Sequence, residues 1–476
     1  MKYLRFIVYF IFCLVLVISC RFTDDYNVDP NATTSDVVTL DKRLPSLQFR
    51  MGTVFGRAFA LRTGNIMGYV TYKQGPTGFN NYVFSPADAS NINMWGDMYS
   101  TVFNQAFQIN ELALKENNLA YSGIAKIAMC YSIVTASTIW GDIPFSQASQ
   151  AFNYPYPSFD SQELIYSSVQ NMLSQAIKEL EKADVQIKPS ADDVIFGGDL
   201  NKWIKVAYAL KARYYLHIVK LDESNYIKAD SALQYALKSN EDNFIIRFET
   251  GIPDVSSPIY NERLSGDTDV DVSFGTLLRN TLADPREKFF AIVRGSVFSG
   301  VRATHGAFYG TQNSYVPILT YEECMFMKAE IEMRLRGKAS AEPFLRDAVS
   351  ASLTRVCSET VGSETNGDLA TAIPLTVQAA YIQKVANIDS VQTDKDAWIA
   401  IFQQKYIAMF LQTESWNDYR RTEKYVDGIK GLPDISPRGD KVLPRRLFYP
   451  SSELNANPSA PPNISDIYQR VWWDTQ

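Results

Sequence analysis

The sequence lacks the short motifs by which many enzymes are recognised. It has no GxSxG nucleophile turn, no HExxH zinc motif, no phosphate-binding P-loop and no GxGxxG dinucleotide turn. Histidine is also scarce, because the chain has only His217, within an apolar helical stretch, and His305, in a glycine-flanked segment. A histidine-based metal site or catalytic triad is therefore not expected, and we predict neither a cofactor nor a bound metal.

Basic runs and long apolar runs are missing as well. The 476 residues carry a formal net charge of -6. Phosphate binding needs clustered lysine and arginine, so we exclude a nucleic-acid partner. The apolar run over residues 6–18 spans about 13 residues, whereas a transmembrane helix needs about 20.

That apolar run has the surroundings of a cleaved leader. Lys2 and Arg5 precede it, and Ser19 and Cys20 follow it, which is the order of regions in a signal peptide. Residues 17–20, Val-Ile-Ser-Cys, resemble the lipobox of bacterial lipoproteins, in which the cysteine is acylated and becomes the mature N-terminus. We expect residues 1–19 to be a lipoprotein signal peptide and Cys20 to be lipidated. The alternative is a secreted protein in which Cys20 is incidental.

The cysteine count excludes a disulfide framework. Removal of the leader takes away Cys13 and lipidation occupies Cys20, which leaves Cys130, Cys324 and Cys357. An odd number cannot pair completely. Cys130 and Cys324 lie in apolar helical stretches, where a free cysteine behaves as a small apolar side chain, so we predict packing roles for both.

What the chain does contain is mostly helical periodicity. Residues 20–40 are polar and rich in turn formers, which suits a flexible tether. In the body, residues 41–476, apolar spacing predicts helices over 43–62, 95–116, 120–139, 160–184, 202–220, 225–238, 321–335, 341–356 and 379–385. An aromatic and proline-rich connector, residues 154–159, precedes the fourth.

Pairs of these helices with alanine at their contacts are typical of tetratricopeptide-like repeats. Glycine and proline interrupt the periodicity near 63–93 and again over 244–315, where we expect long irregular loops. The predicted fold is therefore predominantly all-α, a helical-repeat scaffold with loop-rich insertions and minor β structure.

The stretch over residues 398–422 organises the C-terminal half. Its first part is an apolar helix, and its second part combines carboxylates, arginines and rings, including Glu414, Trp416, Asp418, Arg420 and Arg421. An arginine can pair with a carboxylate while its guanidinium stacks on a ring. We interpret the stretch as a structural clasp; a catalytic role is the alternative.

The two irregular regions carry rings beside amides, and aromatic residues are abundant, with 27 Tyr, 27 Phe and 7 Trp. Exposed rings fit the C–H faces of sugars, and amides and arginines hydrogen-bond the hydroxyls. The first region supplies the candidate glycan-binding residues Tyr69, Tyr72, Lys73, Phe79, Asn80, Asn81 and Tyr82. The second supplies Arg302, Phe308, Tyr309, Gln312, Asn313 and Tyr315, with His305 nearby. The alternative is that these rings pack inward.

Two further possibilities are weaker. Asp267, Asp269 and Asp271 imitate the start of a calcium loop, but Val272 replaces the required glycine and Leu278 the bidentate glutamate. A carboxylate pair for glycoside hydrolysis stays open, because the fold sets its separation.

Several motifs, in this order along the chain, resemble the SusD/RagB family of outer-membrane nutrient-binding lipoproteins. They are the lipobox with Asp24 and Asp25 after it, Asp29-Pro30-Asn31, Trp140-Gly141-Asp142-Ile143-Pro144, Asp284-Pro285-Arg286, Tyr321-Glu322-Glu323, Gln404-Lys405-Tyr406, residues 414–422, residues 446–450 with Glu453 and Asn457, and Trp472-Trp473-Asp474. The resemblance covers essentially the whole chain.

This resemblance implies a helical scaffold on the cell exterior, anchored by lipid in the outer membrane, that captures an oligosaccharide without catalysis. It also implies a partner, a SusC-like TonB-dependent transporter that receives the ligand. A peptide ligand, a glycan-acting hydrolase and a purely structural scaffold are the alternatives. The motifs transfer no ligand-contacting residue to this chain.

Overall fold

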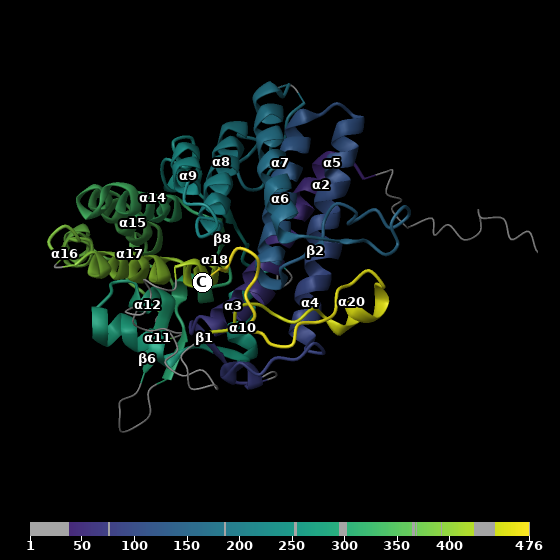
Figure 1. Cartoon of the computed structure of the whole chain (residues 1–476). Coiled ribbons are helices and arrows are strands. Elements are labelled where there is room, and N and C mark those ends of the chain that lie inside the picture. Colours follow the sequence, from purple (N-terminus) through teal and green to yellow (C-terminus); the bar gives the residue numbers. More distant parts are fainter. Residues whose placement is uncertain are drawn as a thin grey trace, which may run out of the picture.

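The computed structural model describes residues 38–74, 77–184, 187–251, 255–294, 302–363, 367, 369–391, 393–422 and 443–475. The predicted signal peptide, Cys20 and most of the predicted tether lie outside these residues. Helices dominate the described chain and its strands are short (Figure 1). The prediction of a predominantly α-helical fold with minor β structure is confirmed.

The first half of the chain is an array of helices that pack side by side in sequence order from α5 to α9 (Figure 1). Its helices are α2 (Leu40–Val54), α3 (Ala60–Ile66), α4 (Ala89–Asp97), α5 (Asn104–Lys115), α6 (Leu119–Trp140), α7 (Gln162–Lys182), α8 (Leu200–His217) and α9 (Asn225–Leu233). The amide of Leu164 donates to the Ser161 hydroxyl at 3.2 Å, so Ser161 caps α7.

Helix α6 is the core of this array. Among the described residues it is the one helix long and apolar enough to span a membrane, and nearly all of that stretch is buried inside the fold. Helix α7 packs closely on it, since a Cβ added to Gly123 would lie 2.7 Å from Cγ of Leu180. A helix that is apolar on all sides is therefore accommodated by neighbours on every side.

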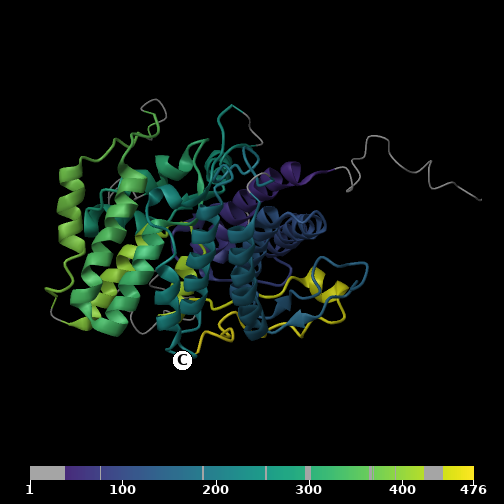
Figure 2. The same ribbon diagram turned by 90° about the horizontal axis from the view of Figure 1, so that it is seen from above.

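The second array lies on the other side of the molecule, as Figures 1 and 2 show. It comprises α14 (Tyr321–Arg336), α15 (Lys338–Cys357), α16 (Leu375–Val385) and α17 (Asp394–Ala408). Helix α18 (Glu414–Arg421) follows α17 and lies towards the centre of the molecule (Figure 1). Buried ion pairs link α14 to its neighbours: Arg213 of α8 binds Glu323 at 2.6 Å, and Arg355 of α15 binds Glu322 at 2.5 Å. These carboxylates are tolerated inside because each one is paired.

The segment 244–315, predicted as a loop region, holds short strands and helices between its irregular parts. They are β4 (Phe244–Ile246), α10 (Pro258–Ser265), β5 (Thr268–Val270), α11 (Val272–Thr276), η8 (Leu277–Leu282), α12 (Glu287–Phe290), β6 (Ala291–Arg294), β7 (Arg302–His305) and α13 (Ala307–Gly310). The other short elements are β1 (Val70–Tyr72), η4 (Thr77–Asn81), β2 (Ile143–Pro144), β3 (Phe159–Asp160), η6 (Asn240–Asp242), β8 (Val316–Leu319) and α20 (Ser451–Ala456).

Each of the four sheets in the described part of the chain is antiparallel and two-stranded. Strand β1 pairs with β5, Val70 opposite Val270, and β4 pairs with β8, Phe244 opposite Leu319. Their partners are distant along the chain, so local periodicity does not reveal these strands. Strand β1 thereby fixes the first irregular region against the second.

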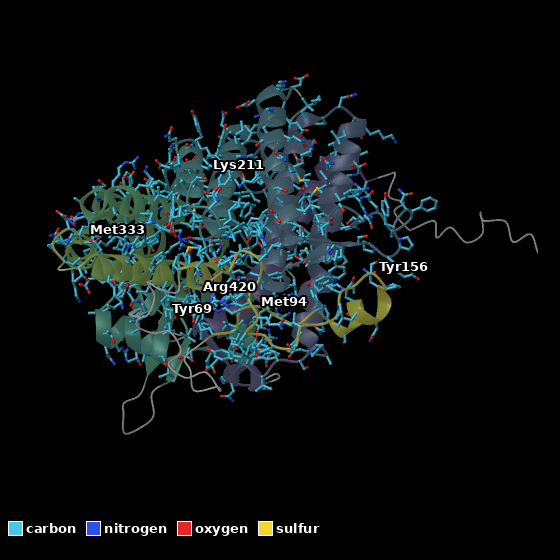
Figure 3. The ribbon with its side chains drawn as sticks, viewed as in Figure 1. Tyr69, Met94, Tyr156, Lys211, Met333 and Arg420 are labelled. Carbon is cyan, nitrogen blue, oxygen red and sulfur yellow. The ribbon has the colours of Figure 1, made fainter. Side chains whose placement is uncertain are left out.

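Most of residues 398–422 are buried, and Arg420 lies near the centre of the molecule, as Figure 3 shows. The stretch is not one helix, because α17 ends at Ala408 and Leu411 adopts a positive φ of 58° before α18 begins. The Arg420 guanidinium lies 3.9 Å from the Trp416 ring centre and 4.7 Å from that of Trp473. It also donates to two carbonyls, those of Thr138 and Arg445, at 2.6 Å each.

Charged partners surround the next residue of α18. Arg421 pairs with Glu330 of α14 and with Asp418, and Lys405 of α17 binds Asp418 at 2.7 Å. All four side chains are buried. These contacts join α14, α17 and α18, as the interpretation of a structural clasp requires.

The cysteines among the described residues, Cys130, Cys324 and Cys357, are buried and form no disulfide. Burial raises the pKa of each thiol above its ordinary value, to about 12 for Cys357. The predicted packing roles of Cys130 and Cys324 are confirmed.

Candidate functional site

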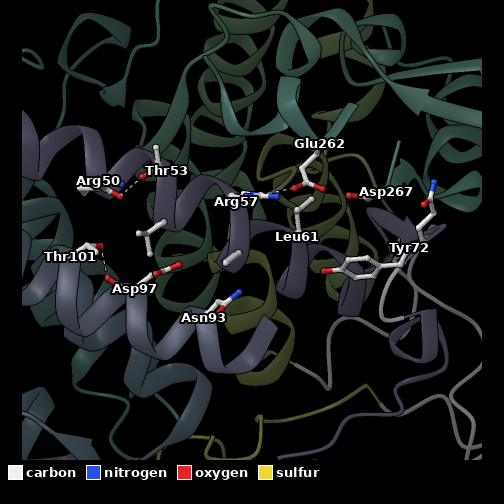
Figure 4. A pocket seen from close by; sticks show the side chains of 13 residues that line it. Arg50, Thr53, Arg57, Leu61, Tyr72, Asn93, Asp97, Thr101, Glu262 and Asp267 are labelled. Atoms are coloured by element: carbon white, nitrogen blue, oxygen red, sulfur yellow. Dashed lines mark hydrogen bonds and ion pairs between the residues drawn. The ribbon is translucent and has the colours of Figure 1, made fainter. Parts of the chain in front are cut away.

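A cavity of about 520 Å³ opens where the first helices meet the irregular regions (Figure 4). One wall is α2 with the π-helical turn η3 (Phe55–Phe59), and a second is α4 with the π-helical turn η5 (Met98–Phe103). The remaining side comes from the end of β1, from α10 and from the residue before β5. The lining residues are Arg50, Thr53, Val54, Arg57, Ala58, Leu61, Tyr72, Gln74, Asn93, Asp97, Thr101, Glu262 and Asp267.

Helical spacing places the lining residues of the two walls on single faces. Arg50, Val54 and Arg57 recur at intervals of four and three, and Asn93 and Asp97 are four apart. Both walls change to π-helical geometry at the cavity, and π-turns are frequent at functional sites. In η5 the hydroxyl of Thr101 donates to the Asp97 carbonyl at 2.6 Å, which gives that backbone group a partner within the turn.

One ion pair crosses the cavity. Nε of Arg57 lies 2.6 Å from Oε1 of Glu262, so η3 is tied to α10. The Glu262 side chain is 5% exposed and that of Arg57 is 61% exposed, so the pair has a buried and a solvent-facing end. This contact uses one N–H group of Arg57 and one carboxylate oxygen of Glu262.

Five other polar side chains of the lining stay uncommitted. Arg50, Gln74, Asn93, Asp97 and Asp267 form no side-chain hydrogen bond and no close ion pair with any other described residue. Burial raises the pKa of Asp97 above its usual range, although Arg50 and Arg57 act in the opposite direction. The cavity thus offers free donors and free acceptors in one place.

Tyr72 supplies the aromatic surface of the cavity, and it is the one predicted glycan-binding residue in its lining. Its ring is half-buried and stands edge-on to Phe79, with the centroids 5.7 Å apart. The Arg62 guanidinium lies 3.2 Å from the centre of the Phe79 ring and 5.6 Å from that of the Tyr72 ring. Tyr72 therefore packs against Phe79 and lies close to Arg62.

The structure places the other predicted residues of the first region around Tyr72 rather than in the cavity. Tyr69 is fully buried and its hydroxyl donates to the Tyr406 carbonyl at 2.5 Å. Phe79 and Tyr82 are also buried, and the Tyr82 hydroxyl donates to the Ile66 carbonyl at 3.2 Å. These rings pack inward, as the alternative interpretation holds.

The polar residues of this region hold its backbone. The Asn80 amide accepts from the Tyr72 backbone N–H at 2.9 Å and donates to the Tyr72 carbonyl at 2.8 Å. Lys73 pairs with Asp269 at 3.2 Å. Asn81 is exposed and does not line the cavity. Asn80 and Lys73 therefore position Tyr72.

The second predicted set lies apart from the cavity, since none of its members appears in the lining. Tyr309 is buried and stacks on Phe290, and the Tyr315 hydroxyl accepts a long hydrogen bond of 3.3 Å from Arg355. Phe308 is half-buried, the Gln312 amide donates to Ser256 at 3.0 Å, and Asn313 is exposed. The Arg302 side chain lies outside the described residues. The structure does not join the two predicted sets in one cavity.

Most of the lining was not predicted from the sequence. The prediction took aromatic residues in the two irregular regions as the binding residues, whereas helices supply most of the polar groups of the cavity. The available signal was charged or amide residues at helical spacing, such as Arg50 and Arg57, or Asn93 and Asp97. That pattern is the same as that of an ordinary solvent-facing helix surface. Only the tertiary contact of α2, α4 and α10 distinguishes them.

In the described part of the chain, no three His, Cys, Asp or Glu side chains are grouped so as to bind a metal. The calcium-like run does not form a loop site: Asp267 lines the cavity, Asp269 pairs with Lys73, and Asp271 caps α11. The carboxylates of the cavity are thus available for hydrogen bonding.

Comparison with known proteins identifies the family that most of the chain matches. Residues 46–450 match the SusD-like_2 family, described as "Starch-binding associating with outer membrane". A sequence search among curated proteins finds no match.

Solved structures share the fold. A chitin-binding protein is 19% identical, with a TM-score of 0.72, and the match covers 92% of this chain and 100% of that one. A SusD/RagB family protein from Bacteroides thetaiotaomicron is 21% identical, with a TM-score of 0.73 and coverage of 92% and 99%. A SusD homolog from Bacteroides fragilis is 18% identical, with a TM-score of 0.73 and coverage of 92% and 100%.

Proposed function

The chain belongs to the SusD-like family of starch-binding, outer-membrane-associated proteins, and we propose that it binds a nutrient glycan in the cavity beside Tyr72 and delivers it to a TonB-dependent transporter. The observation that carries the proposal is the cavity's set of uncommitted polar side chains around one ring. A sugar presents hydroxyls that both donate and accept, and a C–H face that packs on an aromatic ring.

The cavity has the features of a small-ligand site. Its volume of about 520 Å³ falls in the range of roughly 300–1,000 Å³ that such sites occupy. Val54, Ala58 and Leu61 provide apolar surface, and most of the polar groups, including Arg50, Asn93 and Asp97, are placed on helices. Rigid helices hold hydrogen-bonding groups in place before the ligand arrives, which lowers the entropic cost of binding.

Calorimetry of the protein against a panel of oligosaccharides and peptides tests this proposal. We expect oligosaccharide binding that weakens about tenfold in Tyr72→Ala, through loss of the stacking face. A similar loss is expected in Asp97→Asn, because a charged acceptor is replaced by a neutral amide.

Asn81→Ala is the matched control, since Asn81 is exposed in the same region but does not line the cavity. Binding of peptides in place of oligosaccharides would contradict the glycan assignment. If Asn81→Ala or Asn313→Ala lost oligosaccharide affinity while Tyr72→Ala kept it, the binding site would lie in the irregular loops and not in the cavity.

The family is described by binding, and the proposed activity involves no catalysis. Incubation with the bound glycan should therefore release no product. Product that disappears in Asp97→Asn or Glu262→Gln would support the hydrolase alternative.

The proposal includes lipidation at Cys20 and an exterior orientation at the outer membrane. Cys20→Ser should release the protein from membranes, whereas continued attachment independent of other proteins would argue against the lipobox. The transporter step predicts recovery of a TonB-dependent β-barrel with the detergent-solubilised lipoprotein. Absence of such a β-barrel would argue against delivery to a transporter and leave glycan binding alone as the function.

A further inference from the structure

The aromatic loop, residues 145–158, presents three rings to solvent that the cavity does not use. Phe152 is 100% exposed, Tyr154 42% and Tyr156 56%. Figure 3 shows Tyr156 at the outer edge of the molecule, near α20. An apolar ring left in water is unfavourable by itself, so three within five residues call for a partner.

The backbone of this loop is held in place at both ends. Strands β2 and β3 pair antiparallel, Ile143 opposite Asp160. The Asp160 carboxylate accepts from the backbone N–H groups of Phe145 and Ser146 at 2.9 and 2.7 Å. These bonds close the base of the loop.

The part of the loop that carries the rings is also tied down. The Ser158 amide donates to the Gln147 side chain at 2.8 Å, and the Asn457 side chain donates to the Pro157 carbonyl at 2.9 Å. Pro155 and Pro157 further restrict the backbone. The rings are therefore displayed on an ordered segment, which reduces the entropy lost when a ligand binds.

The composition of the loop indicates what that ligand is. Between Asp142 and Asp160 the chain has no charged residue, and between Ile143 and Asp160 it has no Leu, Ile, Val or Met. The side chains that remain are rings, amides, hydroxyls, proline and alanine. Protein interfaces are enriched in arginine and methionine besides rings, and anionic membranes attract Lys and Arg. The loop contains no arginine, methionine or lysine.

Rings interleaved with neutral amides and hydroxyls fit an uncharged sugar chain, whose C–H faces stack on rings and whose hydroxyls bond amides. We propose that the aromatic loop is a second saccharide-binding surface, separate from the cavity, that holds a neutral polysaccharide through Phe152, Tyr154 and Tyr156. The three rings span at most about 14 Å of backbone, so they engage a short stretch of a long chain. The proposal does not depend on the cavity being a glycan site.

Affinity electrophoresis of the protein through gels containing soluble starch, glycol chitin, xylan or mannan tests the proposal. We expect retardation of the wild type in at least one gel, and about a tenfold weaker apparent affinity when Phe152, Tyr154 and Tyr156 are all replaced by alanine, because the ring faces that stack on the sugar chain are lost. Calorimetric affinity of the same variant for a short oligosaccharide bound in the cavity should stay unchanged.

Tyr235→Ala is the matched control, since that ring is 59% exposed on a different part of the surface, and it should not alter retardation. Circular dichroism and the melting temperature establish that the triple variant is folded, as expected for exposed side chains. Full retardation of the triple variant would overturn the proposal. If that variant also no longer copurified with the transporter, the rings would contact the transporter and not a polysaccharide. Absence of retardation of the wild type in all four gels would also overturn it.

These experiments test the cavity assignment and the aromatic-loop proposal separately. If Tyr72→Ala abolishes oligosaccharide binding while the triple variant keeps full retardation, only the second surface is refuted. If the triple variant loses retardation while no oligosaccharide binds the cavity, only the cavity assignment is refuted.

Discussion

His305 is buried among groups that disfavour its charged form. Its Nε2 lies 3.2 Å from the Thr268 hydroxyl, and its Nδ1 has no hydrogen-bond partner among the described residues. Burial, together with the charges of Arg263 and Lys73, lowers the pKa of His305 to about 4. The imidazole is therefore neutral in the folded protein at neutral pH.

This pKa predicts an acid-dependent loss of stability. The unfolded chain has an ordinary histidine pKa of about 6.5, so below that pH the unfolded state binds a proton that the folded state does not. The stabilising contribution is complete above about pH 6.5 and is lost as the pH falls towards 4. Urea unfolding at pH 7.5 and pH 5 should show the wild type losing about 2 kcal/mol more than His305→Gln over that interval. Equal losses in the two proteins would show that His305 is not the titrating group.

At the scale of elements, the β2–β3 pair with Asp160 determines the shape of the aromatic loop. The Asp160 carboxylate accepts two backbone N–H groups and also the Ser146 hydroxyl at 2.9 Å. An asparagine would keep the size but lose the charge and one acceptor oxygen.

Asp160→Asn should therefore lower the free energy of unfolding by about 1–3 kcal/mol. It should also speed proteolytic cleavage within residues 147–158, because the base of the loop opens more often. Mapping the cleavage sites by mass spectrometry checks this. Glu181→Gln, on an exposed face of α7, is the control; unchanged cleavage in Asp160→Asn would mean that the strand pair alone closes the loop.

Helices could be predicted where their own residues carry the signal. The capping residue and apolar spacing of α7 are local, and its boundaries follow from them. The π-turns η3 and η5 were not predicted, and neither were strands β1 and β5, whose register joins Val70 to Val270. Such features depend on partners remote in the chain, which a local pattern does not contain.

At the scale of the molecule, Arg420 joins segments that are far apart in sequence. Its guanidinium donates to the carbonyl of Thr138 on α6 and to that of Arg445 in the C-terminal segment, and it stacks on Trp473. Burial lowers the pKa of Arg420 to about 9, with Asp474 and Tyr166 acting in the opposite direction. These contacts hold α6, α18 and the C-terminal segment together.

Arg420→Ala should lower the free energy of unfolding by about 2–4 kcal/mol, because it leaves buried carbonyls without donors and removes packing on two indole rings. The affinity of the folded fraction for a glycan should be nearly unchanged, since Arg420 does not line the cavity. Chemical unfolding and calorimetry measure the two quantities separately. A selective loss of binding at unchanged stability would restore a functional role for residues 398–422.

The sequence by itself determined the helical class, the family and the clasp, because apolar periodicity, motif order and the mixture of charges with rings are written in consecutive residues. It also supplied the chemistry of sugar binding, rings beside amides, but not its location. Tertiary structure decided that Tyr69 and Tyr309 point into the core, that Tyr72 faces a cavity, and that Phe152, Tyr154 and Tyr156 face solvent. The reason is physical: whether a ring is buried depends on which distant segments pack over it, and residues alike in sequence context differ only in those neighbours.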